Sequence, residues 1–171
     1  MLYEGFSAIK PEQIDENVFK LLHRDWMLIT AGKPGHYNTM TASWGGFGIL
    51  WEKRIALCVV RPHRYTFEFM ESENNYTLSF FDEKYRAALN FCGANSGRDV
   101  DKAAATGLTA VESQSGSVYF TQARLVLECR KLYFQDMNPE NFQAAELETH
   151  YPEKDYHRMY FGEISGCFKK D

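Results

Sequence analysis

The densest group of polar and small residues lies at residues 38–46, which read NTMTASWGG. Three hydroxyl side chains and one amide precede two glycines there. Small residues let a ligand approach the backbone closely, and hydroxyl and amide groups can bond an anionic or heteroaromatic group. The segment therefore indicates a ligand-binding surface, although a strand that leads into a bulge or a tight turn explains the same residues.

A second group comprises Arg61, Arg64 and Thr66, which flank Pro62 directly after a β-branched run. Arginine side chains and the N-terminus of a helix both attract anions. The group predicts an anion site where a strand ends and a helix begins. The alternative is a helix that starts at the proline and carries two solvated arginines.

A third group lies at residues 92–98, which read CGANSGR, and is followed by Lys102. A loop of this composition between two helices presents backbone N–H groups at a helix start, with a positive charge one turn later. An ordinary helix stop followed by a capping box is the simpler explanation, and both can hold together.

Other chemical signatures are missing from the sequence. The serines lack the GxSxG frame of a hydrolase, and neither of the glycine motifs that bind nucleotides occurs. No Cys-x-x-Cys or His-x-x-x-His pair is present, so we expect neither a zinc site nor a disulfide framework. The cysteines expected to be buried free thiols are Cys58, Cys92, Cys129 and Cys167.

Composition limits the class of protein. The chain has 171 residues, 44% of them hydrophobic and 15% aromatic, so we expect one folded domain that spans residues 1–171. The formal net charge of −4 argues against nucleic acid or an anionic membrane as partner. No run approaches the ~20 apolar residues of a membrane span, and the first residues lack the pattern of a secretory signal, so we expect cytoplasmic residence.

Strands dominate the elements that must position these groups. The expected strands cover residues 26–30, 38–44, 55–60, 76–81, 123–134 and 157–168, the last with bulges at Gly162 and Gly166. Gly45 and Gly46 are expected to close the second of these strands. Many strands with few short helices predict a β-barrel with added helices rather than a doubly wound sheet.

Three short helices are expected between the strands. One covers residues 64–71, and another begins at Asp82 as N-cap and ends at Gly93 as C-cap glycine. The third begins with a capping box at Ser96 and closes near Gly107.

In this order and spacing, the three polar groups resemble the flavin reductase-like, FMN-binding split-barrel proteins, and among them the flavoredoxin type. The similarity extends from about Asp25 to the C-terminal strand. It implies a mainly β fold with short helices, a Greek-key split β-barrel, and a homodimer with FMN at the subunit interface. The FMN contacts that the resemblance implies are Thr39, Met40, Thr41, Ala42, Ser43, Trp44, Arg61, Arg64, Tyr65, Thr66, Cys92, Ser96, Gly97 and Lys102.

The implied function is that of an oxidoreductase that transfers hydride from NAD(P)H to bound flavin. Because the flavin carries the reactivity, no catalytic side chain is assigned. No separate nicotinamide motif is present, so a flavoredoxin-like electron carrier with a redox protein as partner is the alternative. His36 and His63 lie beside the motifs and leave a haem-binding member of the same barrel class open.

The segment 136–155 is polar and has little pattern. It is expected to form either a loop over the pocket, in which His150 and Tyr151 touch a second substrate, or an ordinary surface excursion.

Overall fold

The computed structural model describes residues 3–171. Strands carry most of the regular structure. They are β1 (Phe6–Ala8), β2 (Met27–Lys33), β3 (His36–Ala42), β4 (Gly45–Leu50), β5 (Lys53–Val60), β6 (Asn75–Phe80), β7 (Ala110–Glu112), β8 (Val118–Phe120), β9 (Leu125–Asp136) and β10 (Arg158–Lys170).

The helical segments are short. The α-helices are α1 (Val18–Lys20), α2 (Tyr65–Ser72), α3 (Arg86–Ala94) and α4 (Lys102–Thr106). The 3-10 helices are η1 (Pro11–Gln13), η3 (Glu83–Tyr85), η4 (Pro139–Asn141) and η5 (Ala145–His150). One π-helical segment, η2 (Leu21–Asp25), follows α1. No helix among residues 3–171 is long and apolar enough to span a bilayer.

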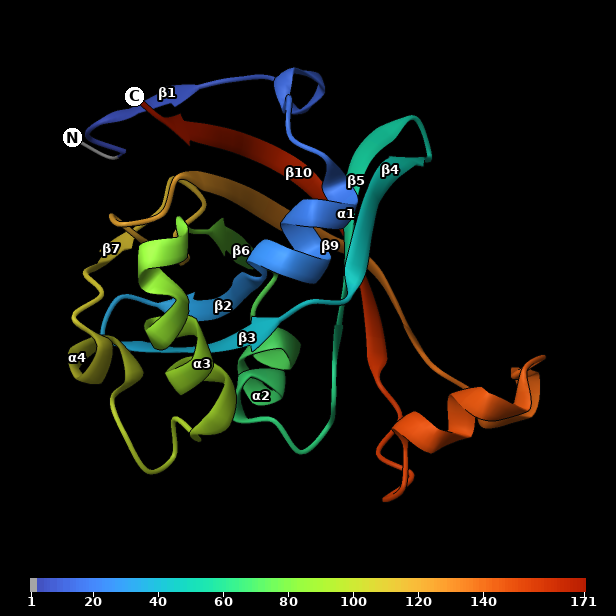
Figure 1. Cartoon of the computed structure of the whole chain (residues 1–171). Helices are drawn as coiled ribbons and strands as arrows, with labels where there is room; N and C mark the ends of the chain where they lie inside the picture. The colour runs from blue at the N-terminus through green and yellow to red at the C-terminus, as the bar shows by residue number, and fades with distance from the viewer. Residues whose placement is uncertain (1–2) are drawn as a thin grey trace.

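One antiparallel sheet organises the fold (Figure 1). Its strands lie in the order β3-β2-β6-β9-β10-β5-β4, and β1 pairs with the end of β10. The two outermost strands, β3 and β4, are consecutive in the chain and only Ser43 and Trp44 separate them. The sheet must therefore curl until its first and last strands approach each other without pairing. This arrangement is a split β-barrel.

Alternation of side chains along the strands builds two separate cores. On β2, Met27 and Ile29 join the core inside the barrel, whereas Leu28 points to the opposite face. On β9, Leu127 and Val126 divide in the same way. Helices α3 and α4 cover the second core, to which Leu89 and other α3 side chains contribute. The packing against this core holds both helices beside the sheet, where β3 forms the edge.

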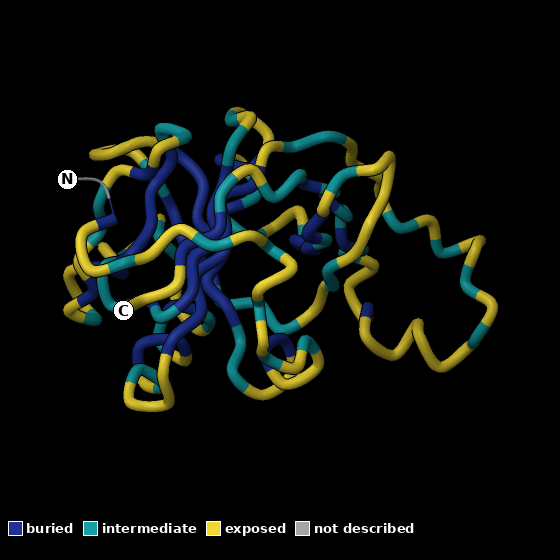
Figure 2. Tube along the Cα trace, turned by 90° about the horizontal axis from the view of Figure 1, so that it is seen from above, coloured by how far each residue is buried: buried dark blue, intermediate teal, exposed yellow. Residues whose placement is uncertain are grey.

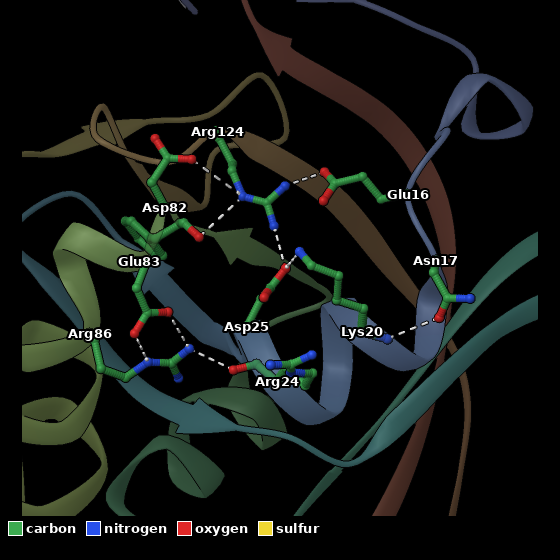
Figure 3. A network of polar contacts seen from close by, with 10 residues as sticks. Glu16, Asn17, Lys20, Arg24, Asp25, Asp82, Glu83, Arg86 and Arg124 are labelled. Atoms are coloured by element: carbon green, nitrogen blue, oxygen red, sulfur yellow. Dashed lines mark hydrogen bonds and ion pairs between the residues drawn. The ribbon is translucent and has the colours of Figure 1, made fainter.

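A network of charged residues fixes the start of α3 (Figure 3). Arg124, which precedes β9, pairs with Glu16 and with Asp25 at 2.7 Å, and lies 3.7 Å from Asp82. At the first residue of α3, Arg86 pairs with Glu83 of η3 at 3.0 Å. The network joins the N-terminal turns to the segment that leads into α3.

An arm (residues 137–157) connects β9 to β10 and projects from the barrel (Figure 1). Most of its trace is exposed (Figure 2). Tyr151 and His157 are exceptions, since both are buried at the base of the arm. The arm therefore contacts the barrel through a few side chains near its ends.

The six predicted strands and the predicted first helix are confirmed, with ends that differ by a few residues. The predicted bulges are confirmed as well, because the β9–β10 register shifts next to Gly162 and Gly166. At Gly162 an added Cβ would lie 2.3 Å from the buried Tyr76 hydroxyl oxygen, so only a glycine fits beside that ring. All four cysteines are free and buried, as expected.

The predicted helix boundaries around the third polar group are wrong. Gly93 lies inside α3, where an added Cβ would approach Thr41 of β3 to 3.4 Å. Ser96 caps only a turn, and α4 begins later, with Asp101 as N-cap accepting a hydrogen bond from the Ala104 amide at 3.1 Å.

Strand β4 was also missed, because two glycines in succession suggest a turn. Gly45 instead begins this strand at φ +152°, where an added Cβ would lie 2.2 Å from the Leu57 carbonyl oxygen. The glycine is therefore required by the close approach of β4 to β5, and no turn closes there.

Candidate functional site

Four hollows adjoin one another along β3 and together form a groove. We name each after one residue: the Trp44 hollow of about 280 Å³, the Leu89 hollow of about 300 Å³, the Ser96 hollow of about 260 Å³ and the His36 hollow of about 340 Å³. Arg64 lines the first three of them, so these three are continuous.

The Trp44 hollow lies where β3 passes into β4. It is lined by Met40, Thr41, Ala42, Ser43, Trp44, Val59, Arg61, Arg64 and His157. The Trp44 side chain remains 41% exposed, and its ring centroid lies 5.1 Å from that of His157 and 5.4 Å from that of His150. The end of an edge strand thus presents small residues and a large ring on one wall.

The arm forms the opposite wall of the Trp44 hollow. Arg61 pairs with Asp155 at 2.6 Å and donates to the carbonyl oxygen of His150 at 2.8 Å. The Tyr151 hydroxyl lies 2.9 Å from Nδ1 of His157. Burial, together with the nearby Arg61 charge, lowers the pKa of His157 to about 4, so its ring is neutral at pH 7.

The Leu89 hollow joins β3 to α3. It is lined by Trp26, Thr41, Ala42, Ser43, Arg64, Leu89, Asn90 and Gly93. The Thr41 hydroxyl donates to the Leu89 carbonyl oxygen at 2.5 Å, which ties the strand to the helix. An added Cβ on Gly93 would lie 3.4 Å from the Thr41 Cβ, so α3 and β3 are in van der Waals contact beside the hollow.

The Ser96 hollow lies between the loop after α3 and the start of α2. It is lined by Asn38, His63, Arg64, Tyr65, Thr66, Gly93, Ala94, Asn95, Ser96, Gly97, Arg98 and Lys102. Nδ2 of Asn38 donates to the Thr66 hydroxyl at 2.8 Å. An added Cβ on Gly97 would lie 1.9 Å from the side-chain oxygen of Asn38, so this loop can approach β3 only with glycine at that position.

Two positive side chains at the Ser96 hollow lack an anionic partner. Lys102 is 5% exposed, and its Nζ donates to the carbonyl oxygens of Thr39 at 2.8 Å and Cys92 at 2.9 Å. Nη2 of Arg64 is buried and has no hydrogen-bond partner. Among residues 3–171, no carboxylate pairs with either side chain, and no acidic residue lines the hollow.

The electrostatic cost of this arrangement appears in the pKa values of both groups. Burial, followed by the neighbouring Arg64 charge, lowers the pKa of Lys102 to about 8. Burial and the nearby Arg61 charge lower the pKa of Arg64 in the same way. A buried cation without a counter-ion is unfavourable, so an anionic ligand in the Ser96 hollow would stabilise both.

The structure brings most of the predicted contact residues to the groove. Residues 40–44 and Arg61 line the Trp44 hollow, and Arg64 lies between it and the Ser96 hollow. The predicted residues that line the Ser96 hollow are Arg64, Tyr65, Thr66, Ser96, Gly97 and Lys102. Thr39 lines only the His36 hollow.

Cys92 does not reach the groove. Its thiol is fully buried in the core beneath α3, and only its carbonyl oxygen takes part, as an acceptor for Lys102.

Sequence reasoning missed several lining residues. His157 reaches the Trp44 hollow from the end of the arm, more than a hundred residues away in the chain, and local pattern carries no sign of that proximity. Asn38 begins the first polar group. Its side-chain amide, directly before the hydroxyl residues of that group, is the feature of the sequence that could have identified it as a lining residue.

Comparison with known proteins gives one sequence family. A family model described as "Flavin reductase like domain" matches residues 19–164. No curated protein sequence matches the chain.

Solved structures match over most of the chain. The FMN-binding domain of a flavin reductase-like enzyme from Shewanella baltica has 17% identity and a TM-score of 0.70, and the match covers 96% of this chain and 77% of that one. A flavoredoxin from Methanosarcina acetivorans has 19% identity and a TM-score of 0.68, with 95% and 77% covered. An NADH:FAD oxidoreductase from Streptomyces globisporus, solved with NAD and FAD fragments, has 15% identity and a TM-score of 0.63, with 85% and 74% covered. At these identities the matches establish the shared split-barrel fold.

The unpaired charge of Arg64 leads to a stability prediction. Arg64→Met removes a half-buried cation that lacks an anionic partner, so the ligand-free protein should gain about 1 kcal/mol in its free energy of unfolding. Arg61→Met is the matched control, because it removes the guanidinium partner of Asp155 and leaves only His63 beside that carboxylate, so it should lower stability by about 1–3 kcal/mol. Urea unfolding of both variants measures the difference. Equal destabilisation by the two substitutions would contradict the assignment of Arg64 as an unpaired charge.

Proposed function

The chain belongs to the family of flavin reductase-like domains, and from this premise we propose that it binds FMN along β3 and transfers hydride from NAD(P)H to the bound flavin. The single observation that carries the proposal is that two cations at the Ser96 hollow, the buried Lys102 and the half-buried Arg64, have no anionic partner among residues 3–171. A phosphate group is an anion of the size and charge that these side chains need.

The groove fits the shape of FMN. With its phosphate in the Ser96 hollow, the ribityl chain would pass Arg64 in the Leu89 hollow and the ring would enter the Trp44 hollow. Gly93 and Gly97 keep the path free of side chains where α3 and its following loop approach β3. The Leu89 hollow thus offers an open path for the ribityl chain between the ring and the phosphate.

The residues around the Trp44 hollow have distinct roles in this proposal. Backbone amides and hydroxyl groups of residues 41–43 contact the polar edge of the ring, and the Trp44 ring covers its side. Arg61, held in place by Asp155, supplies positive charge beside the ring. The bound flavin supplies the hydride-accepting chemistry, and the protein positions it and excludes water.

Reductase activity is favoured over simple electron carriage by the openness of the ring end. Trp44 is partly exposed and the arm meets the barrel there through only a few side chains, so a nicotinamide has access to the hollow. The Streptomyces globisporus relative is described as an NADH:FAD oxidoreductase, which agrees with this choice.

The phosphate assignment predicts that FMN binds more than tenfold more tightly than riboflavin, a difference of over ~1.4 kcal/mol. Lys102→Gln should shrink that advantage, because an amide can still donate to the two carbonyl oxygens but carries no charge. Lys84→Gln, on the surface away from the groove, is the control and should leave it unchanged. Flavin fluorescence quenching gives the affinities. Equal binding of riboflavin and FMN to the wild type would refute the phosphate site.

The same preparation separates the enzyme from the electron carrier. Protein loaded with FMN should oxidise NADH or NADPH faster than free FMN does. If FMN binds tightly but neither nicotinamide is oxidised above the rate of free flavin, the protein is a carrier and the proposed hydride transfer is wrong.

We also propose that two copies associate through an aromatic patch formed by Trp51 of the β4–β5 turn, Tyr133 of β9 and Phe161 of β10, away from the part of the sheet that α3 and α4 cover. Trp51 is 55% exposed and Tyr133 46% exposed, and their ring centroids lie 6.1 Å apart. The Phe161 ring continues this patch at 5.7 Å from Tyr133. Contiguous exposed aromatic side chains are typical of protein–protein interfaces.

The dimer proposal is tested by substitution in that patch. Tyr133→Asp places a charge between the aromatic rings and should convert a dimer to a monomer in sedimentation experiments at micromolar protein. Phe19→Asp is the control, because Phe19 is 83% exposed on α1, away from this patch. A wild-type protein that sediments as a monomer would overturn the proposal.

A further inference from the structure

The backbone of Trp26 is strained where the N-terminal turns pass into β2. Trp26 directly follows the π-helical segment η2, and its torsion angles are φ 67° and ψ 172°. Glycine adopts this conformation freely, whereas a Cβ atom makes it unfavourable. The sequence nevertheless places one of its largest side chains at this position.

Contacts around Trp26 hold it in this conformation. Its indole Nε1 donates to the carbonyl oxygen of His23 at 3.1 Å. The Arg86 guanidinium lies over the indole, 4.2 Å from the ring centroid, and donates to the carbonyl oxygen of Arg24 at 2.5 Å. The charged network of Figure 3 fixes Asp25, the residue directly before Trp26. Backbone strain of this kind persists only where the surroundings impose it, and it is concentrated at ligand sites.

Trp26 also lines the groove along β3. Its half-buried side chain forms part of the wall of the Leu89 hollow. The Leu89 hollow and the Trp44 hollow share residues 41–43 and Arg64. A flat ligand that lies over residues 41–43 would therefore meet Trp44 in one hollow and Trp26 in the other.

Packing within the protein gives no reason for an indole at this position. Trp26 is one of the partly buried side chains at the margin of the second core. A glycine would remove the backbone strain, and a leucine would still cover that margin. A flat ligand in the groove does give a reason, because aromatic rings make favourable contacts with one another.

We propose that Trp26 is a second aromatic wall of the flavin site, which contacts the flavin ring over residues 41–43. The inference rests on the proposed flavin site and deepens it by naming a residue that selects a flat ring. The N-terminal turns hold the indole in place against the strain of its backbone. Because the contact is with the ring, it does not depend on the phosphate.

Titration of riboflavin and FMN against Trp26→Leu tests the contact. This variant should weaken both flavins by the same factor, about fivefold, because it removes an aromatic contact with the ring that they share. Lys102→Gln is the matched comparison and should weaken FMN alone, since it removes a charge beside the phosphate. Flavin fluorescence quenching gives the four affinities.

Trp26→Phe separates a contact with the ring from a general effect on folding. It keeps a flat side chain and should recover most of the affinity that Trp26→Leu loses. The visible circular dichroism of the saturated flavin should fall in Trp26→Leu and return in Trp26→Phe, because this signal reports how the ring is held.

Thermal unfolding of the ligand-free protein tests the strain. Trp26→Gly should unfold about 2–4 °C above Trp26→Ala, because glycine alone adopts the backbone conformation freely. Phe19→Gly and Phe19→Ala, at an exposed position of α1, are the control pair. There the order should be reversed, because alanine favours a helix and glycine does not.

The outcomes distinguish this inference from the proposal on which it rests. If the wild type binds both flavins and Trp26→Leu binds them equally well, Trp26 is no wall of the site and the flavin site stands. Loss of FMN affinity alone in Trp26→Leu would also overturn the ring contact. A Trp26→Gly variant less stable than Trp26→Ala would overturn the strain. Failure of the wild type to bind either flavin would refute the proposed function itself.

Discussion

The site depends on two positive side chains beside β3, the buried Lys102 and the half-buried Arg64, that no carboxylate among residues 3–171 neutralises. Removing an ammonium or guanidinium group from water is unfavourable unless charge or hydrogen bonds compensate for it. Lys102 obtains partial compensation from two carbonyl oxygens, and Arg64 leaves one nitrogen without a partner. Under the proposed function, an anion bound between them would compensate for the remaining cost, and the phosphate of the flavin would relieve a feature that is unfavourable in the ligand-free protein.

The split of the barrel explains why these charges line a groove rather than a closed core. β3 is an edge of the sheet, and its free side faces α3, α4 and the start of α2. Gly93 and Gly97 let those elements approach the strand without filling the space beside it. The Arg124 network and the second core fix the position of α3 relative to β3. Contacts outside the groove therefore determine the spacing between its two walls.

Local sequence pattern was sufficient for the strands and for much of the groove. Residues 55–60 form an apolar run rich in Ile and Val that predicted the buried strand β5, and the polar and small side chains of residues 38–46 predicted a groove lining that residues 40–44 provide. Pattern failed where a contact between distant segments decides the outcome. Gly45 is a glycine because β5 approaches β4 there, and not because a strand ends, and Gly93 lies inside α3 in contact with Thr41 of β3. His157 reaches the groove through the β5–β10 pairing, which no local signal encodes.

Proton uptake on FMN binding tests the role of the buried cations most directly. With a pKa of about 8 in the free protein, Lys102 is only partly protonated near pH 8, and a phosphate dianion beside it must raise that pKa. Calorimetric titrations at pH 8 in buffers of different ionisation enthalpy should therefore give an uptake of up to about half a proton, which Lys102→Met abolishes. FMN binding without proton uptake at this pH, or with the same uptake in Lys102→Met, would contradict the account.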